Sequence, residues 1–332
     1  MTDLDRLTIG GRLQYGWMPT RPRRADPLDG ARSPLTPLRR TRLKEWLGVF
    51  ITHPEWSAGF LLNDAKYLTA SDFHAYHWAS DTLVTHATSG GVRLPADVLD
   101  RVASATRPGY DICCEFGGDG GTHRIAIDLA ADDDGPAVRG DLTLDGASAS
   151  APLSVSERLP RGSMYTWKQA FPVSGTLRVG EQTIEYLPTR DVLLVDEHRS
   201  LLPYRTDWDW GTFAFPTADG IVGANFASRP HRADQRGESG LWIDGGCEPL
   251  GEVTFTPAGD DPLDPWTITS DDGRLEVEFT PRRRKPTLID YKVVIMDYFM
   301  MYGSYRGVLR GARRSHEVRD VHGSCERMHA RL

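Results

Sequence analysis

The residues best suited to chemistry lie near the middle of the chain, directly after an aliphatic run. Residues 192–195 are Val-Leu-Leu-Val, and Asp196, Glu197 and His198 follow them. If residues 191–198 form a strand, Asp196 and His198 share a face with two of the aliphatic side chains. Burial raises the pKa of a carboxyl group on such a face, and a neighbouring imidazole lowers it again. This pattern favours Asp196 as a general acid, with His198 holding its tautomer or charge.

The same residues also have a purely structural interpretation. A buried Asp–His or Asp–Arg pair can close one end of a β-barrel, and Arg190, Arg199 and Arg205 are near enough in sequence to take part. Structural ion-pair networks perturb pKa values as catalytic groups do. Both interpretations stay open at the level of sequence.

Two indoles follow this segment closely. Trp208 and Trp210 flank Asp209, and in a strand the indoles share one face while Asp209 takes the other. Indole rings line apolar pockets and stabilise cations. We therefore expect Trp208, Asp209 and Trp210 at a ligand site, and core packing between two domains is the alternative.

Three more residues are candidates for the same site. Asn225 is the only amide in the apolar segment 220–226, where it can orient a ligand or satisfy the backbone. Tyr165 and Trp167 share one face of another expected strand. Tyr165 is a candidate proton relay, and Trp167 is a candidate ligand contact.

The sequence does not favour a metal or an organic cofactor. Two groups of side chains contain enough histidine to suggest a metal site: His74, His77 and His86, and His322, Glu326 and His329. The first two histidines fall on opposite faces of a strand, which suits the geometry of zinc poorly. The second group has the spacing of a short helix, which we interpret as a cap on the C-terminal domain. The glycine-rich segment 117–121 lacks the helix and Lys-Ser/Thr pair of a phosphate loop.

Length and composition limit the broad class. A chain of 332 residues exceeds the usual span of one core, so two domains are expected. The net charge is −7, and Arg282–Lys285 is the one concentrated basic run, which argues against nucleic acid as a partner. The first eleven residues lack the apolar core of a signal peptide, and the longest apolar stretch, Val293–Met301, is too short to span a bilayer. The four cysteines lack CxxC spacing. We expect a cytoplasmic protein without membrane insertion; the sequence indicates no oligomeric state.

The elements that position these residues are expected to be mostly strands. From Val49 onward, short alternating segments are bounded by Gly, Pro, Asn and Asp, and several Gly-containing dipeptides suit hairpin turns. Residues 39–47 and 94–105 are the best helix candidates. The pattern predicts an all-β protein of two antiparallel β-sandwich or β-barrel units with minor helix, comprising residues 1–199, with an irregular lead-in, and 200–332.

Short motifs along nearly the whole chain resemble one known family. They are Lys44-Glu45-Trp46, Asp64–Leu68, Asp196-Glu197-His198, Trp208–Phe213, Gly223-Ala224-Asn225 and Val321–Leu332. The chain resembles domain-of-unknown-function family 2804, in the tandem lipocalin-like superfamily of carotenoid hydratases, AttH-like proteins and decalin-forming Diels–Alderases. This resemblance implies two calycin-type barrels and an apolar ligand. It implies no particular reaction, because the named relatives carry out different chemistry and fold does not fix function.

Two main classes of function remain. The first is an enzyme that acts on an apolar small molecule without an organic cofactor, as a hydratase, isomerase or cyclase, with acid assistance from Asp196. The second is a non-catalytic carrier of a lipid or another hydrophobic ligand, in which the same residues anchor a polar group. Carbohydrate binding or carbohydrate chemistry through Trp and Asp is a weaker third class.

Overall fold

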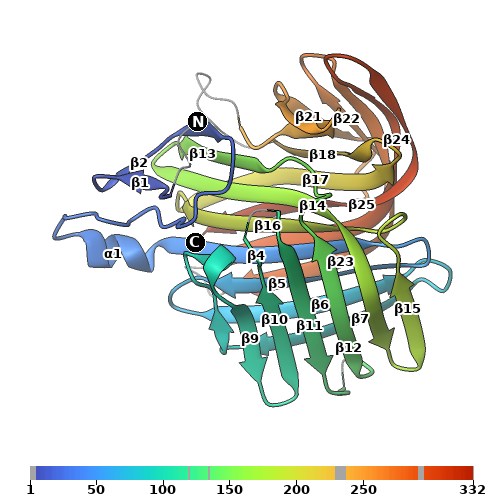
Figure 1. Cartoon of the computed structure of the whole chain (residues 1–332), viewed down its shortest axis with the longest axis horizontal. Helices are drawn as coiled ribbons and strands as arrows, with labels where there is room; N and C mark the ends of the chain where they lie inside the picture. The colour runs from blue at the N-terminus through green and yellow to red at the C-terminus, as the bar shows by residue number, and fades with distance from the viewer. Residues whose placement is uncertain (1–4, 119, 134, 229–236, 291–294, 332) are drawn as a thin grey trace. The chain divides into compact units, whose positions relative to one another are not determined.

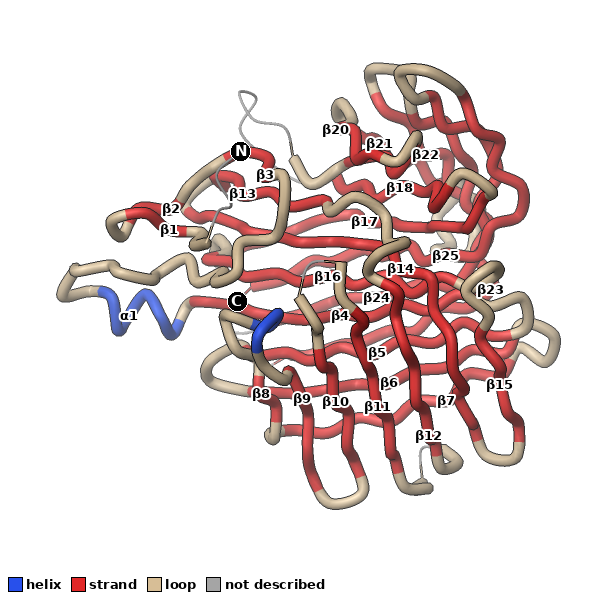
Figure 2. Tube along the Cα trace, in the orientation of Figure 1, coloured by secondary structure: helices blue, strands red, loops and turns tan. Residues whose placement is uncertain are grey.

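The computed structural model describes residues 5–118, 120–133, 135–228, 237–290 and 295–331. Antiparallel strands dominate the described chain, which confirms the all-β class and the tandem lipocalin-like architecture with minor helix (Figure 1, Figure 2). The chain divides into unit 1, Met1–Ser156 with Met164–Leu201, and unit 2, Glu157–Ser163 with Leu202–Leu332. The expected domain boundaries, 1–199 and 200–332, stay a prediction.

Unit 1 contains one large, curled antiparallel sheet. Its strand order is β7-β6-β5-β4-β16-β14-β12-β11-β10-β9-β8, with β13 pairing β14 and β3, and β15 pairing β14. The first part of the chain forms β1 (Thr8–Ile9), β2 (Arg12–Leu13), β3 (Gly16–Met18), α1 (Thr36–Thr41), β4 (Leu43–Thr52), β5 (Trp56–Asp64), β6 (Thr69–His77), β7 (Thr82–Ser89), β8 (Val92–Arg93) and the 3-10 turn η1 (Val98–Asp100). The next part forms β9 (Ala103–Arg107), β10 (Tyr110–Glu115), β11 (Thr122–Leu129), β12 (Val138–Asp145), β13 (Leu153–Leu159), β14 (Gly162–Val179), β15 (Gln182–Tyr186) and β16 (Val192–Leu201).

Unit 2 contains a nine-stranded sheet within the described residues, in the order β20-β19-β18-β17-β25-β24-β23-β22-β21. Its strands are β17 (Arg205–Thr217), β18 (Gly220–Ser228), β19 (Gly240–Ile243), β20 (Gly246–Pro249), β21 (Val253–Pro257), β22 (Trp266–Ser270), β23 (Leu275–Asp290), β24 (Ile295–Arg310) and β25 (Ser315–Arg331). The last three of these nine strands are long and follow one another along the chain, so antiparallel pairing between consecutive strands builds this part of the sheet.

Each unit buries one face of its sheet in its own apolar core. In unit 1, β11 alternates exposed and buried positions, and its inward residues Ile125, Ile127 and Leu129 join the core. In unit 2, Trp266 and Tyr305 are among the large side chains of the core. Burying one large apolar side chain contributes about 1.5–3 kcal/mol. The hydrophobic alternation of the sequence therefore determines which face of each sheet points inward.

The backbone conformation of β14 requires a glycine at position 175. Gly175 has φ +117°, and a Cβ atom there would lie 2.1 Å from the backbone oxygen of Asp141 on β12. Residues with a side chain rarely adopt this backbone conformation. Gly175 also stands where β14 begins to pair with β15 while still pairing with β12.

The sequence-based helices are largely wrong. Of residues 39–47, only the part up to Thr41 lies in α1, and Leu43 already begins β4. Residues 94–105 contain only the turn η1 before β9 begins at Ala103. Residues 322–329 lie in β25 rather than in a short helix. In the first and third segments, hydrogen bonding to neighbouring strands overrides the local preference for helix.

No helix among the described residues is long and apolar enough to cross a membrane.

Candidate functional site

Asp196 is one of three ionisable side chains that meet on the sheet of unit 1. Its Oδ2 lies 2.6 Å from Nζ of Lys168 and its Oδ1 lies 3.3 Å from Nε2 of His198. Nζ of Lys168 is also 3.2 Å from Nε2 of His198. The Lys168 side chain has no exposed surface, whereas that of Asp196 is 18% exposed. We call Lys168, Asp196 and His198 the proton cluster.

Strand pairing brings the proton cluster together. Asp196 and His198 lie two residues apart on β16, and Lys168 lies on β14, the neighbouring strand in the sheet. On the other side of β16, His198 pairs with Trp46 of β4, and the two rings stack with centroids 4.4 Å apart. The stacked indole fixes the orientation of the imidazole.

A glycine leaves one flank of Asp196 without a side chain. Gly48 of β4 is the direct cross-strand partner of Asp196, and a Cβ built there would have only ordinary contacts, the nearest 3.6 Å away at Leu61. The carboxylate therefore has no cross-strand side chain beside it on β4.

The proton cluster lies on an otherwise apolar stretch of its sheet face. Val192 and Leu194 precede Asp196 on the same face of β16, and Phe50 pairs with Leu194 across from β4. The inward core of unit 1 contains Leu193 and Val195, the residues that alternate with them. The face of Asp196 is thus the one opposite the core. Asp196 shares this face with Val192 and Leu194, as alternation along a strand predicts, but the face is not the one that lines the core of unit 1.

A second charged group lies on the core side of the same strands. Glu197 accepts hydrogen bonds from Arg21 at 2.6 and 2.7 Å and from Nε of Arg199 at 2.9 Å. Arg199 also donates to Glu45 of β4, which is in turn paired with Lys66. The Glu197 and Arg199 side chains are fully buried. We call Arg21, Glu45, Glu197 and Arg199 the core ion network.

The core ion network keeps Glu197 charged. Burial disfavours the carboxylate form, but the guanidinium groups of Arg21 and Arg199 outweigh it and lower the pKa of Glu197 below its ordinary value. Arg199 is therefore occupied by Glu197 and Glu45 and does not pair with Asp196. Arg190 pairs with Asp191 at 2.7 Å. Neither Arg190 nor Arg199 therefore forms an ion pair with Asp196.

Tyr165 and Trp167 lie on the core side of β14, opposite the proton cluster. Both belong to the apolar core, and Lys168 alternates with them along the strand. The Tyr165 hydroxyl is 3.4 Å from the Ser154 hydroxyl, and burial raises the pKa of Tyr165 well above its ordinary value. The Arg21 guanidinium lies 5.6 Å from the centre of the Trp167 ring. The structure brings Asp196 and His198 together but places Tyr165 and Trp167 on the other face.

The remaining predicted site residues lie in unit 2. Trp210 donates from Nε1 to Asn225 Oδ1 at 2.9 Å, and Asn225 donates to the Glu238 carbonyl at 2.8 Å. Trp208 donates to Glu326 at 2.9 Å. These contacts satisfy the polar atoms of Asn225 and of both indoles. The expectation that they bind the same ligand as Asp196 stays a prediction.

Asp209 lies on the opposite face of β17 from these indoles, as the alternation predicts. It forms an ion pair with Arg327 at 2.7 Å. The Arg327 guanidinium lies 4.6 Å from the centre of the Trp266 ring, which belongs to the core of unit 2. Asp209 therefore holds the Arg327 guanidinium in place over the Trp266 ring.

The described histidines lie apart from one another or have other partners. In the described part of the chain, no group of three or more His, Cys, Asp or Glu side chains could hold a metal ion. His74 packs over Gly59, and His86 contacts Asp132 at 3.2 Å and the Pro136 carbonyl at 2.9 Å. Glu326 accepts hydrogen bonds from Trp208 and from Tyr298.

Sequence reasoning missed Lys168, the residue closest to Asp196. A signal was available, because Lys168 lies on the opposite face of an expected strand from Tyr165 and Trp167, where an unpaired charge is costly if that face is also buried. Trp46 and Glu45 belonged to a motif of the family resemblance, although no role was assigned to either.

The comparisons with known proteins agree with this architecture. The family described as Domain of unknown function (DUF2804) matches residues 4–332. The chain belongs to the DUF2804 family. Among curated proteins, none has a matching sequence.

Solved structures share the tandem lipocalin-like fold at low sequence identity. One is CghA with Sch210972, with a TM-score of 0.57 and 12% identity, covering 88% of this chain and 89% of that chain. Another is kievitone hydratase from Nectria haematococca, with a TM-score of 0.51 and 14% identity, covering 86% and 88% respectively. These likenesses confirm that the DUF2804 chain has the fold of the expected superfamily.

Proposed function

We propose that this DUF2804 protein is a cofactor-independent enzyme that acts on an apolar small molecule, as a hydratase, isomerase or cyclase. The observation that carries the proposal is the proton cluster. A fully buried lysine is paired with Asp196 at 2.6 Å, and both lie on a sheet face whose neighbouring residues are aliphatic or aromatic. Charged groups in such surroundings are costly, and functional sites are where proteins maintain them.

The geometry supports a proton shared by three groups. Lys168 donates to Asp196, and His198 Nε2 is within 3.3 Å of both partners. His198 accepts through Nε2 when that nitrogen is unprotonated and donates through it after protonation. In this proposal Asp196 does not act alone: it receives a proton from Lys168 or His198 and passes it to the substrate.

This arrangement suits acid-initiated chemistry on a carbon–carbon double bond. The cluster protonates one carbon, which forms a C–H bond and leaves a cation on the other carbon. In a hydratase, water then adds to that cation and the resulting oxonium ion loses a proton. In an isomerase, an adjacent proton leaves. In a cyclase, a second double bond attacks and the new cation then loses a proton. The proton released in that step restores the cluster. Trp46, stacked on His198, provides an aromatic face for the cation.

The comparisons favour this class of substrate without fixing the reaction. One similar structure is named a hydratase, and another was solved with the small molecule Sch210972. A carrier of hydrophobic ligands is the competing function.

Substitution of the proton cluster tests the proposal. Turnover of an extract of apolar metabolites is followed by mass spectrometry for the wild type, Asp196→Asn and Lys168→Met. Loss of a general acid costs roughly 10²–10⁴-fold in rate, so we expect a loss of this size in both variants, with binding retained in native mass spectrometry. Asp128→Asn, which changes an exposed carboxylate on β11, serves as the matched control and should retain full turnover. Ligand binding without turnover in the wild type would contradict catalysis and support a carrier.

A further inference from the structure

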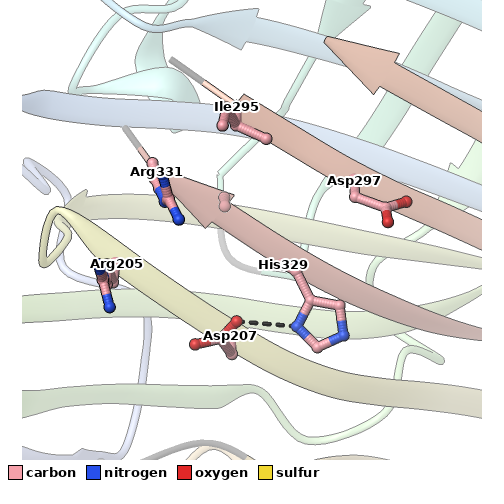
Figure 3. Close-up of a pocket in the computed structure, with 7 residues that line it drawn as sticks. Arg205, Asp207, Ile295, Asp297, His329 and Arg331 are labelled. Atoms are coloured by element: carbon pink, nitrogen blue, oxygen red, sulfur yellow. Dashed lines mark hydrogen bonds and ion pairs between the residues drawn. The ribbon is translucent and has the colours of Figure 1, made fainter. Parts of the chain in front are cut away.

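Unit 2 contains a pocket that takes no part in the proposed reaction. It has a volume of about 320 Å³ and lies at one end of β17, β24 and β25. The lining residues are Arg205, Asp207, Ile295, Asp297, His329, Ala330 and Arg331 (Figure 3). Trp208, the indole assigned to the ligand site on the same strand, alternates with the pocket residues and faces the other side of the sheet.

The strand register sorts the pocket charges into two rows. Arg205 and Arg331 are direct cross-strand partners, so their guanidinium groups belong to one row. Asp207, His329 and Asp297 are paired across the three strands and form the next row. Successive rows on one face are two residues apart, a separation of roughly 7 Å along the strand. One row is cationic and the other carries two carboxylates.

Three of these charged groups have no ion-pair partner among the residues that the structure describes. His329 Nδ1 and Asp207 Oδ1 are 2.8 Å apart, and Figure 3 shows the two side chains turned toward each other. Arg205, Arg331 and Asp297 form no ion pair with any residue that the structure describes. Within the described part of the chain, the pocket therefore offers two guanidinium groups on one side and a carboxylate without an ion-pair partner on the other.

We propose that this pocket binds a small zwitterion, with its anionic group on Arg205 and Arg331 and its ammonium group on Asp297. Two arginines and two aspartates give the pocket a net charge of zero when His329 is neutral, so a ligand of either sign alone would leave one row uncompensated. Guanidinium groups are suited to carboxylate recognition, and the volume lies at the small end of the range for ligand pockets.

A matched series of three probes tests the inference. 4-Aminobutyrate, butyrate and butylamine have the same carbon chain and carry both charges, the negative charge or the positive charge. Each is titrated calorimetrically into the full chain at about pH 8, above the ordinary pKa of histidine. We expect 4-aminobutyrate to bind at least about fivefold more tightly than butyrate or butylamine, the scale of one exposed ion pair.

Single substitutions test which pocket residues bind the anionic group of the ligand and which bind its ammonium group. Arg331→Gln should weaken binding of 4-aminobutyrate and butyrate about fivefold, and Asp297→Asn should weaken binding of 4-aminobutyrate and butylamine by a similar factor. Arg282→Gln removes an exposed arginine of β23 outside the pocket and should leave all three affinities unchanged. Equal binding of butyrate and 4-aminobutyrate, or no binding of any probe, would overturn the inference.

Discussion

Replacing Glu197 by glutamine tests whether the core ion network holds β16 against β4 and the lead-in. The glutamine keeps the size of the side chain but removes the charge that receives three hydrogen bonds from Arg21 and Arg199. Breaking a fully buried ion pair costs about 3–5 kcal/mol, because the remaining charges stay buried without compensation. For a domain of 150–250 residues this corresponds to a fall in Tm of about 6–20 °C.

The pH dependence of this effect has a definite sign. The folded pKa of Glu197 is lower than its ordinary value, so its carboxylate stabilises the fold fully above about pH 4.5. The stabilisation is lost as the pH falls from there through the folded pKa. Glutamine does not titrate, so the difference in unfolding free energy between wild type and Glu197→Gln should shrink below about pH 4.5.

Urea unfolding followed by far-ultraviolet circular dichroism, at neutral and at acidic pH, measures both effects. Hydrogen exchange of the amides of β4, β14 and β16 assigns the loss to unit 1. Glu185→Gln, at an exposed position on β15, is the matched control and should change the free energy of unfolding by no more than about 0.5 kcal/mol. A neutral-pH loss below about 1 kcal/mol in Glu197→Gln, or a difference that persists unchanged into acid, would refute the reasoning.

Three further predictions concern buried positions. Asn225→Ala removes one partner from each of two buried hydrogen bonds, leaves Trp210 Nε1 and the Glu238 carbonyl without that partner, and should destabilise the protein by about 1–3 kcal/mol in urea unfolding; an unchanged midpoint would contradict this role. Gly175→Ala forces a side chain into a left-handed conformation against a backbone oxygen and should cost about 1–3 kcal/mol, whereas a neutral effect would show that β14 tolerates a side chain at its bend. Burial raises the pKa of Tyr165, so spectrophotometric titration of wild type and Tyr165→Phe should differ only after alkaline unfolding; an earlier difference would indicate an accessible phenol.

The sequence predicted features that depend on alternation along one strand. Asp196 and His198 fall on the face opposite Leu193 and Val195, as their period-two spacing indicates. The opposite orientations of Asp209 and Trp210 follow from the same rule.

The sequence did not predict which partners would lie beside these residues. Lys168 reaches Asp196 because β14 is placed next to β16, and that order of strands comes from the whole sheet. The Arg21–Glu197 contact joins residues 176 positions apart. The segment 43–47 has a helical composition, but pairing with both β5 and β16 makes it a central strand. Pairing between strands that are distant in sequence thus explains both why residues 43–47 are not helical and why the contact of Lys168 with Asp196 was not predicted.

Deuterium transfer tests the central claim most directly, because every acid-initiated reaction proposed above moves a proton from the enzyme to carbon. The wild type and Asp196→Asn are incubated in D₂O with a mixture of apolar polyenes, and the recovered compounds are analysed by mass spectrometry. We predict a carbon-bound deuterium in the product formed by the wild type, and a loss of this label by roughly 10²–10⁴-fold in Asp196→Asn. A compound that the wild type binds and releases without carbon-bound deuterium would contradict acid catalysis by the proton cluster.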